Sequence, residues 1–141
     1  MILYLDTSAL LKTYFEEEGS ALVAEGIDRA DLVATCWIAY VEARAAFARR
    51  LSPEDRRRAR GGLDREWSRY FKIEATETLI REAAAVADTY RLRGYDAMHL
   101  AAARALRERR IGAVAFGSWD REQEEAASRD GFLLLRTATA R

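Results

Sequence analysis

Short apolar runs alternate with amphipathic segments along this chain, and the alternation limits the folds open to it. The runs that predict strands are Ile2–Leu5, Leu32–Thr35, Ala113–Phe116 and Phe132–Arg136, and Ile73–Ala75 is either a connection or a further strand. The segments between the runs place apolar residues at helical spacing. This order predicts an α/β fold, with a mostly parallel sheet between two layers of helices. With 141 residues, we expect a single domain over residues 1–141.

Helix boundaries are marked by capping residues, proline and glycine. The expected helices cover Ala9–Tyr14, Ala21–Asp28, Trp37–Leu51, Ala97–Arg109 and Arg121–Ser128, and two more begin at Pro53 and after Thr76. We expect Gly61 and Gly62 to interrupt the helix that begins at Pro53, because glycine weakens a helix interior. Gly94 is expected to end the helix that Thr76 caps.

The composition is that of an ordinary globular protein, with 50% hydrophobic residues, 33% charged residues and a formal net charge of +0. A neutral protein does not hold nucleic acid by bulk charge. The stretch Glu42–Lys72 is nevertheless locally basic, with ten Lys and Arg residues against five Asp and Glu residues. A basic face on a neutral protein is therefore expected there.

Several classes of protein are excluded early. The one cysteine, Cys36, cannot form an internal disulfide, and its apolar neighbours predict a buried, inert thiol. No apolar run approaches the roughly 20 residues of a membrane span. The N-terminus lacks the basic region of a signal peptide. We therefore expect no membrane association and a cytoplasmic location.

Two acids follow predicted strands. Asp6 comes directly after Ile2–Leu5, and Asp120 follows Ala113–Phe116 after a three-residue turn. Parallel strands share a carboxyl edge, where the ligands of α/β proteins bind, so both acids are expected at that edge. Each is also an ordinary helix cap. Thr7 can cap the first helix instead, which would leave Asp6 free for chemistry.

Glu42 falls in a helical pattern with Ile38, Val41 and Ala45 on the same face. That face is apolar, and a carboxylate on it must be paired, hydrogen-bonded or bound to a metal. The two interpretations are a functional acid and a salt bridge to an arginine. We favour the functional acid.

Asp96 opens the predicted helix Ala97–Arg109, where it can serve as the N-cap. The alanines that follow allow close packing, so Asp96 is expected near a contact between helices. His99 lies three residues later on the same face. A histidine that packs, or that supports a metal ligand, is more frequent at such a position than a ligand itself.

Carboxylates that converge on one cleft repel each other and need a cation. Oxygen ligands select Mg²⁺ or Mn²⁺ over zinc. Such ions hold phosphates and activate water, so the acids favour phosphodiester hydrolysis. The chain has no GxxxxGKS/T loop, which argues against ATP binding. In aspartyl-phosphate phosphatases a second Asp stands two positions after the first, where this chain has Ser8. In receiver-type domains an adjacent acidic pair follows the first strand, whereas here Thr7 follows Asp6.

Four segments in order resemble the PIN-domain family, and within it the VapC-type toxins of bacterial and archaeal toxin–antitoxin pairs. They are DTSALLKTYFEEEGS (6–20), WIAYVEARAAFAR (37–49), RGYDAMHLAAA (93–103) and FGSWDREQEEAA (116–127). The third is the most specific. Each segment carries one of the four acids, and together they span nearly the whole chain.

The resemblance implies a PIN-like three-layer α/β/α sandwich with an acidic pocket for one or two Mg²⁺ or Mn²⁺ ions. The acids of that pocket would be Asp6, Glu42, Asp96 and Asp120. It further implies endonucleolytic cleavage of tRNA, ribosomal RNA or messenger RNA, inhibition by a cognate VapB-type antitoxin, and a homodimer. Asp6 and Asp96 would contact the metal directly or through water, Glu42 would complete its shell or orient water, and Asp120 would act through water.

Other residues have supporting or open roles. Thr7 and Ser118 are expected to hydrogen-bond the carboxylates or a metal-bound water. Trp119 either stacks on a base or packs on a neighbouring helix, and we favour packing. The arginine-rich segment 56–69 is a solvated helix face, a site for RNA phosphates or a site for antitoxin acids. The alternative function is an inactive PIN-like binding module that acts through a protein partner.

Overall fold

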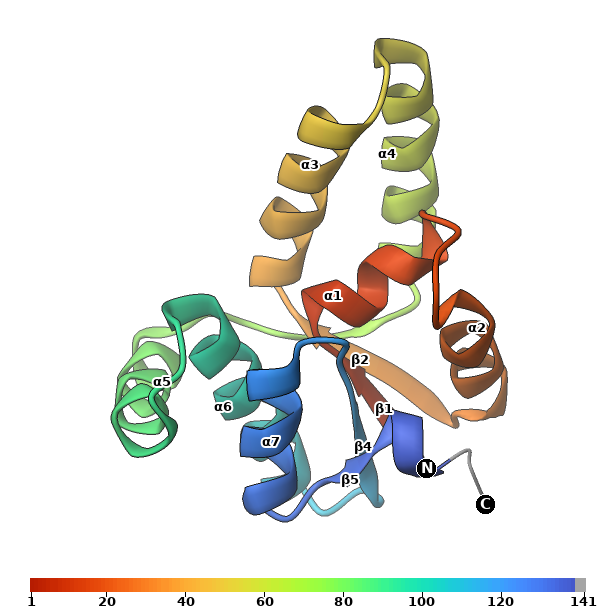
Figure 1. Ribbon diagram of the computed structural model, residues 1–141. Coiled ribbons are helices and arrows are strands. Elements are labelled where there is room, and N and C mark those ends of the chain that lie inside the picture. Colours follow the sequence, from red (N-terminus) through yellow and green to blue (C-terminus); the bar gives the residue numbers. More distant parts are fainter. Residues whose placement is uncertain (139–141) are drawn as a thin grey trace.

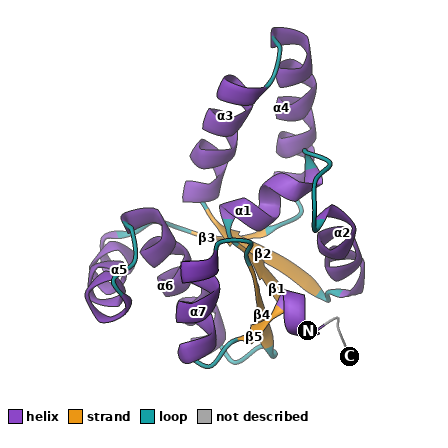
Figure 2. Cartoon of the chain, viewed as in Figure 1, coloured by secondary structure: helices purple, strands orange, loops and turns teal. Residues whose placement is uncertain are grey.

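The structure is a computed structural model that describes residues 1–138. Within them lies a five-stranded sheet in the order β3-β2-β1-β4-β5, and every pair of neighbours is parallel (Figures 1 and 2). The strands are β1 (Ile2–Leu5), β2 (Leu32–Cys36), β3 (Phe71–Ile73), β4 (Val114–Gly117) and β5 (Leu133–Leu134). The predicted α/β fold with a parallel sheet is confirmed.

Helices cover both faces of the sheet. One face carries α1 (Thr7–Leu10), the 3-10 turn η1 (Leu11–Thr13), α2 (Ser20–Arg29), α3 (Ile38–Arg50), α4 (Pro53–Trp67) and α8 (Leu135–Ala138). The other carries α5 (Glu77–Tyr90), α6 (Gly94–Glu108) and α7 (Arg121–Arg129). The pair α3 and α4 projects away from the sheet (Figure 1). Among the described helices, none combines the length and apolar character needed to cross a bilayer.

The central strand β1 divides the core in two. Ile2 and Tyr4 pack with α5, α6 and α7, whereas Leu3 and Leu5 pack with α1, α3 and α4. This alternation follows from the two-residue period of a strand, and burial of both faces is normal for a parallel sheet between helices. Because β1 is central, the residue that follows it stands at the middle of the carboxyl edge.

Both predictions that used glycine as a helix boundary are wrong. Helix α4 continues through Gly61 and Gly62, because Leu63 and Trp67 are buried in the core, and that burial offsets the roughly 1 kcal/mol lost per helical glycine. Helix α5 ends where Arg91 takes a left-handed conformation with φ 55°. Gly94 instead begins α6.

Other boundaries move by a few residues. The first helix begins at Thr7, earlier than Ala9, and tightens into η1. The strand expected at Ile73 begins at Phe71, which pairs with Ala34 of β2. The last predicted strand, Phe132–Arg136, shrinks to β5 because the chain turns into α8.

The predicted buried face of α3 is also wrong. Val41 is 56% exposed, and Ala45 is exposed as well. The buried residues are Ala39, Ala43, Ala46 and Phe47, and the first two and Phe47 belong to the core cluster that includes α1 and α4. Alanines occur on both sides of this helix, so its apolar pattern does not point to one face. Glu42 lies at the edge of the buried face, with 23% of its side chain exposed.

Asp130 links α5 and α6 to the end of α7. Its carboxylate, 8% exposed, accepts hydrogen bonds from Arg104, from Arg107 and from Tyr90 Oη at 2.8 Å. Burial opposes the charge, but the hydrogen bonds from Arg104 and Tyr90 hold the pKa of Asp130 below its usual range. The charged form is therefore favoured by folding.

The variant Asp130→Asn is expected to lower the free energy of unfolding by about 2–3 kcal/mol at pH 7, because it leaves two arginines without their carboxylate. A depressed folded-state pKa stabilises the protein above the unfolded value of about 3.9, and this contribution is lost as the pH falls through the folded value. Urea unfolding at pH 7 and at pH 3 should therefore show a narrower gap between wild type and variant at pH 3. A constant gap would contradict the charge-based explanation.

Candidate functional site

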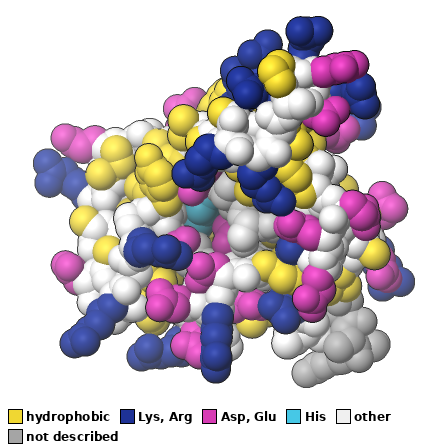
Figure 3. Space-filling model, turned by 45° about the horizontal axis from the view of Figure 1, so that its top comes forward, with side chains coloured by type: hydrophobic (Ala, Val, Ile, Leu, Met, Phe, Trp, Pro, Cys, Tyr) yellow, Lys and Arg dark blue, Asp and Glu magenta, His cyan; other side chains and the backbone are white. Residues whose placement is uncertain are grey.

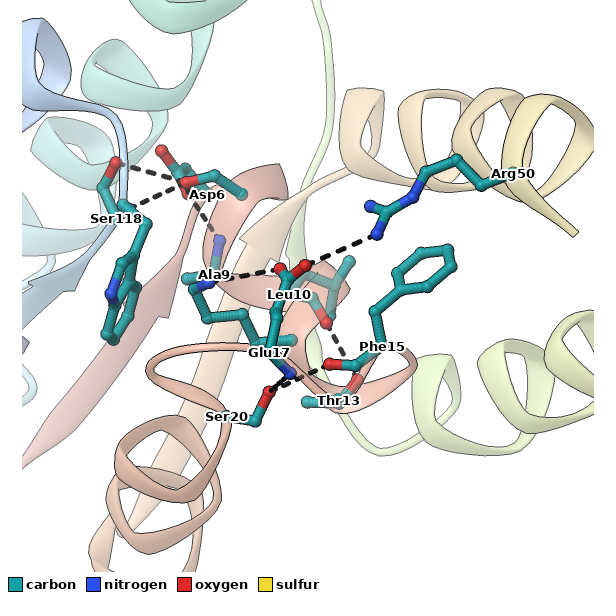
Figure 4. A network of polar contacts seen from close by, with 12 residues as sticks. Asp6, Ala9, Leu10, Thr13, Phe15, Glu17, Ser20, Arg50 and Ser118 are labelled. Carbon is teal, nitrogen blue, oxygen red and sulfur yellow. Dashed lines mark hydrogen bonds and ion pairs between the residues drawn. The ribbon is translucent and has the colours of Figure 1, made fainter.

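Asp6 lies where β1 passes into α1, beside the end of β4. Its backbone N–H donates to Gly117 O at 3.0 Å, which continues the pairing of β1 with β4. Its Oδ1 accepts hydrogen bonds from Ala9 N at 3.0 Å and from Ser8 Oγ at 2.7 Å, and Ser8 Oγ lies 3.4 Å from Ser118 Oγ (Figure 4). Asp6 itself therefore caps α1. The alternative in which Thr7 takes the cap and leaves Asp6 free is wrong.

Asp96 lies in the first turn of α6, and the N-cap position belongs to Arg93, so the predicted N-cap role of Asp96 is wrong. The side chain of Asp96 is 19% exposed. Its Oδ2 is buried and has no hydrogen-bond partner, and the nearest cationic atom is Arg93 Nε at 3.4 Å. A buried carboxylate oxygen without a partner is costly, and it marks a place where a ligand atom would be stabilised.

Asp120 caps α7, as predicted. Its Oδ1 accepts from Gln123 N at 3.0 Å, while its Oδ2 accepts from Arg93 Nη2 at 3.1 Å. Ser118, 1% exposed, accepts from Asp120 N through its Oγ at 3.0 Å. The buried side chain of Gln123 donates to Asp96 O at 2.9 Å. These contacts hold the starts of α6 and α7 against each other.

Glu42 reaches the site through Thr7 and His99 rather than through an arginine. Thr7 Oγ1 donates to Glu42 Oε1 at 2.5 Å, and His99 Nε2 lies 3.1 Å from the same oxygen. His99 Nδ1 lies 2.8 Å from Tyr4 Oη. A carboxylate only accepts, so His99 Nε2 carries a proton that it donates to Glu42. The partners of Glu42 are thus Thr7 and His99, and the alternative of a salt bridge to an arginine is wrong.

Burial and repulsion disfavour the charged form of the acids at the centre of the edge. Burial raises the pKa of Asp6, although His99, Ser118 and Ser8 oppose the shift. Burial, together with Asp120 and Asp6, raises the pKa of Asp96, and Arg93 opposes it. Glu42 differs: burial acts against its charge, but hydrogen bonds from His99 and Thr7 hold its pKa below the usual range.

A cavity of about 450 Å³ opens beside these acids, lined by Glu42, Arg93, Gly94, Tyr95 and Asp96. Figure 3 shows the single histidine on the floor of a hollow, with acidic and basic side chains around it. A larger cavity of about 690 Å³ lies between α2 and α4, and none of the four predicted acids lines it. Two of the four predicted acids, Glu42 and Asp96, line the smaller cavity.

The donor set fits a hard divalent ion, but the side chains are not arranged as a complete shell. Within the described residues, no three His, Cys, Asp or Glu side chains are grouped to hold one ion. Arg93 forms ion pairs with Asp96 and Asp120, and His99 Nε2 contacts Glu42, so these acids already have partners within the chain. Mg²⁺ needs only one or two carboxylates, because it keeps several waters. Asp96 Oδ2 is buried without a hydrogen-bond partner, so it is an oxygen that such an ion would stabilise.

Two predictions outside the four acids can be compared with the structure. Trp119 packs as we favoured: a Cβ on Gly19, whose φ is 92°, would lie 2.5 Å from Trp119 Cε2, and Lys12 Nζ lies 5.0 Å from the ring centre. Cys36 is buried, and burial raises the pKa of its thiol. Its thiol is therefore inert, as expected.

Sequence reasoning missed three contributors to this site. Ser8 donates to Asp6 and accepts from Trp119 N at 2.9 Å, which joins the loops after β1 and β4. Glu124 is a further acid whose pKa is raised by burial and by Asp6 and Asp120. Arg93 contacts two of the predicted acids. Only Arg93 had a sequence signal, since it precedes Asp96 by one helical turn.

Comparison with protein families identifies relatives of the whole chain. The model of the PIN domain matches residues 3–128. Ribonuclease VapC45 and Ribonuclease VapC49, from two strains of Mycobacterium tuberculosis, are each 30% identical to this chain over 135 residues. The match covers 92% of this chain and 92% of each relative.

Solved structures share the fold at lower identity. PAE2754 from Pyrobaculum aerophilum matches with a TM-score of 0.72 and 21% identity, over 99% of this chain and 93% of that one. The sarcin-ricin-loop-cleaving toxin VapC20 of Mycobacterium tuberculosis matches with a TM-score of 0.68 and 17% identity, over 93% and 96%. FitAcB from Neisseria gonorrhoeae gives 0.66 and 18%, over 95% and 96%. At these identities the likeness concerns the fold.

Proposed function

Because this chain belongs to the PIN-domain family, we propose that it is a metal-dependent endoribonuclease and the toxin of a VapBC-type toxin–antitoxin pair. Its curated relatives are named ribonucleases. The observation that carries the proposal is the buried Oδ2 of Asp96, which has no hydrogen-bond partner and lies among acids that repel each other at the carboxyl edge of the sheet. Acids that repel each other favour a bound cation, and the carboxyl edge of a parallel sheet is where ligands of α/β proteins bind.

The ion of this site is Mg²⁺ or Mn²⁺, one or two in number. The donors are carboxylate oxygens, which these hard ions prefer over the sulfur and nitrogen that suit zinc. Asp6 and Asp96 would hold the ion directly or through water, and Asp120 would act through water. When bound, the ion neutralises charge on the phosphate and lowers the pKa of a water molecule.

The remaining residues position these groups for hydrolysis of a phosphodiester bond. Glu42, fixed by Thr7 and His99, orients the attacking water and accepts its proton. Ser8 holds the Asp6 carboxylate, and Ser118 holds the backbone of Asp120. The capping bonds to Ala9 N and Gln123 N hold the carboxylates of Asp6 and Asp120 in position without a metal.

The substrate is RNA, and the partner is a small antitoxin. Solved structures with this fold include a toxin–antitoxin complex from Klebsiella pneumoniae and a VapBC2 complex from Rickettsia felis bound to a DNA fragment of its promoter. By analogy, a cognate antitoxin would inhibit this chain by covering the acidic edge. A homodimer is part of the same proposal.

The direct test is to incubate the purified protein with total RNA and Mg²⁺, in parallel with Asp96→Asn. We expect discrete fragments with wild type, and none with the variant or in excess EDTA. Equal cleavage by both proteins would indicate a contaminant and overturn the proposal. If neither protein cleaves RNA while the wild type still binds Mn²⁺, the inactive binding module becomes the better interpretation.

The projecting helix α4 makes a separate prediction. Arg57, Arg58, Arg60 and Arg65 are exposed on it, and in Figure 3 basic side chains gather at that end of the molecule. If they hold RNA phosphates, the double variant Arg57→Gln/Arg60→Gln should reduce the slope of log affinity against log salt by about 2. Fluorescence anisotropy between 50 and 200 mM salt (roughly the range where such contacts dominate) measures this slope. The control Arg81→Gln, on α5, should leave the slope unchanged, and an unchanged slope in the double variant would exclude the RNA role.

A further inference from the structure

Arg93 bridges two acids of the proposed metal site. Its Nη2 lies 3.1 Å from Asp120 Oδ2, and its Nε lies 3.4 Å from Asp96 Oδ2. The two carboxylates come from α6 and from the start of α7, which are otherwise joined here by Gln123. The guanidinium therefore supplies, from within the chain, the positive charge that this pair of acids lacks.

The same oxygens are the ones that a divalent ion would use. Asp96 Oδ2 has no hydrogen-bond partner even with Arg93 beside it, because the Nε contact is longer than a good charged hydrogen bond. A small ion at about 2.1 Å from such an oxygen interacts far more strongly than a guanidinium at salt-bridge distance. The side chain of Arg93 is 75% exposed, and exposed ion pairs are weak. When an ion binds Asp96 and Asp120, the guanidinium is therefore easily released.

We propose, building on the proposed function, that Arg93 exchanges partners during the reaction: it neutralises Asp96 and Asp120 until a divalent ion binds, and then its guanidinium binds a phosphate of the RNA backbone. Guanidinium groups match phosphate with two parallel hydrogen bonds. Arg93 already lines the cavity of about 450 Å³, next to the 57% exposed ring of Tyr95. A phosphate bound there would lie beside the acids, and a neighbouring base could stack on Tyr95.

The metal half is tested by calorimetric titration of Mn²⁺ into wild type, Arg93→Gln, Arg93→Lys and Arg121→Gln. Arg121 follows Asp120 directly and is 92% exposed, and its ion pair is with Glu125, so Arg121→Gln removes the same charge without touching the two acids. Arg93→Gln is expected to bind Mn²⁺ about 3- to 10-fold more tightly than wild type, since two exposed ion pairs no longer compete. Arg121→Gln should stay within about twofold, and Arg93→Lys should lie between wild type and Arg93→Gln. Equal affinity in Arg93→Gln and Arg121→Gln would overturn the proposal.

The RNA half is tested with a fluorescein-labelled RNA, whose binding is measured after rapid mixing and before cleavage proceeds. With Mn²⁺, Arg93→Gln should weaken binding about 3- to 10-fold and reduce the salt slope by about 1. In EDTA, Arg93 stays paired with Asp96 and Asp120, so wild type and Arg93→Gln should bind the RNA with equal affinity. Equal weakening with and without Mn²⁺ would mean that Arg93 adds only general positive charge, and would refute the exchange.

These results separate this inference from the proposed function. If wild type binds Mn²⁺ and cleaves RNA but Arg93→Gln behaves like Arg121→Gln, the nuclease assignment stands and the exchange is wrong. If wild type does not bind Mn²⁺, the metal site itself is wrong, and the exchange fails with it.

Discussion

Replacing Asp6 with asparagine is expected to abolish RNA cleavage while making the metal-free protein more stable. Asp6 is 2% exposed, and burial raises the pKa of its carboxyl. The charged form that a metal would bind is therefore energetically unfavourable in the metal-free protein. Asparagine caps helices as well as aspartate does, and its amide oxygen can keep the bond to Ala9 N. We expect a gain of about 1 kcal/mol in the free energy of unfolding in EDTA, the size typical when a strained functional residue is replaced.

The loss of cleavage has a different cause. An amide is a poor ligand for Mg²⁺ compared with a carboxylate, and it leaves the site with one negative charge fewer. A decrease of about 4 kcal/mol in transition-state stabilisation corresponds to a roughly thousandfold slower reaction. Loss of cleavage together with loss of folding would contradict the explanation, because it would make Asp6 a structural residue.

Three measurements on wild type and Asp6→Asn test this. Urea unfolding in EDTA gives the change in stability. Thermal melts with increasing Mn²⁺ should raise the melting temperature of wild type only, because a ligand stabilises the state that binds it. Single-turnover cleavage of total RNA gives the change in rate. The control Asp31→Asn removes an exposed carboxylate paired with the N-terminus, and it should leave cleavage unchanged.

His99→Ala is expected to have the second-largest effect. The imidazole is 2% exposed and joins Tyr4, Thr7 and Glu42, so its removal leaves buried polar groups without partners. We expect the free energy of unfolding to fall by about 2–4 kcal/mol. Cleavage should also fall by about 10- to 100-fold, because Glu42 is no longer held in position.

Two conservative variants separate the structural part from the positioning part. In His99→Gln, the side-chain amide can reach the place of Nε2 and contact Glu42, whereas in His99→Asn it can reach the place of Nδ1 and contact Tyr4. If His99 positions Glu42, the glutamine variant should recover more of the cleavage rate than the asparagine variant at similar stability. Recovery that simply follows stability in both variants would contradict a positioning role.

The largest errors of sequence-based prediction were errors about faces and partners. Helix α3 has alanines all around it, so its periodicity suggested that Val41 is buried, and only the packing against α1 and α4 decides that Ala43 and Phe47 are. Glu42 was expected among apolar side chains or on an arginine, yet its partners come from α1 and α6. A local pattern carries no information about which distant element supplies a partner.

The sequence by itself determined the parallel α/β fold and the positions of Asp6 and Asp120 after strands, because two-residue and helical periods are local properties and strand ends in a parallel sheet share one edge. Only the tertiary structure decided which groups meet. The pairing of β1 with β4 brings Asp6 to Ser118, and the packing of α6 against α7 places Arg93 between Asp96 and Asp120. Such contacts join residues far apart in the chain, and they follow from how the layers pack rather than from any single segment.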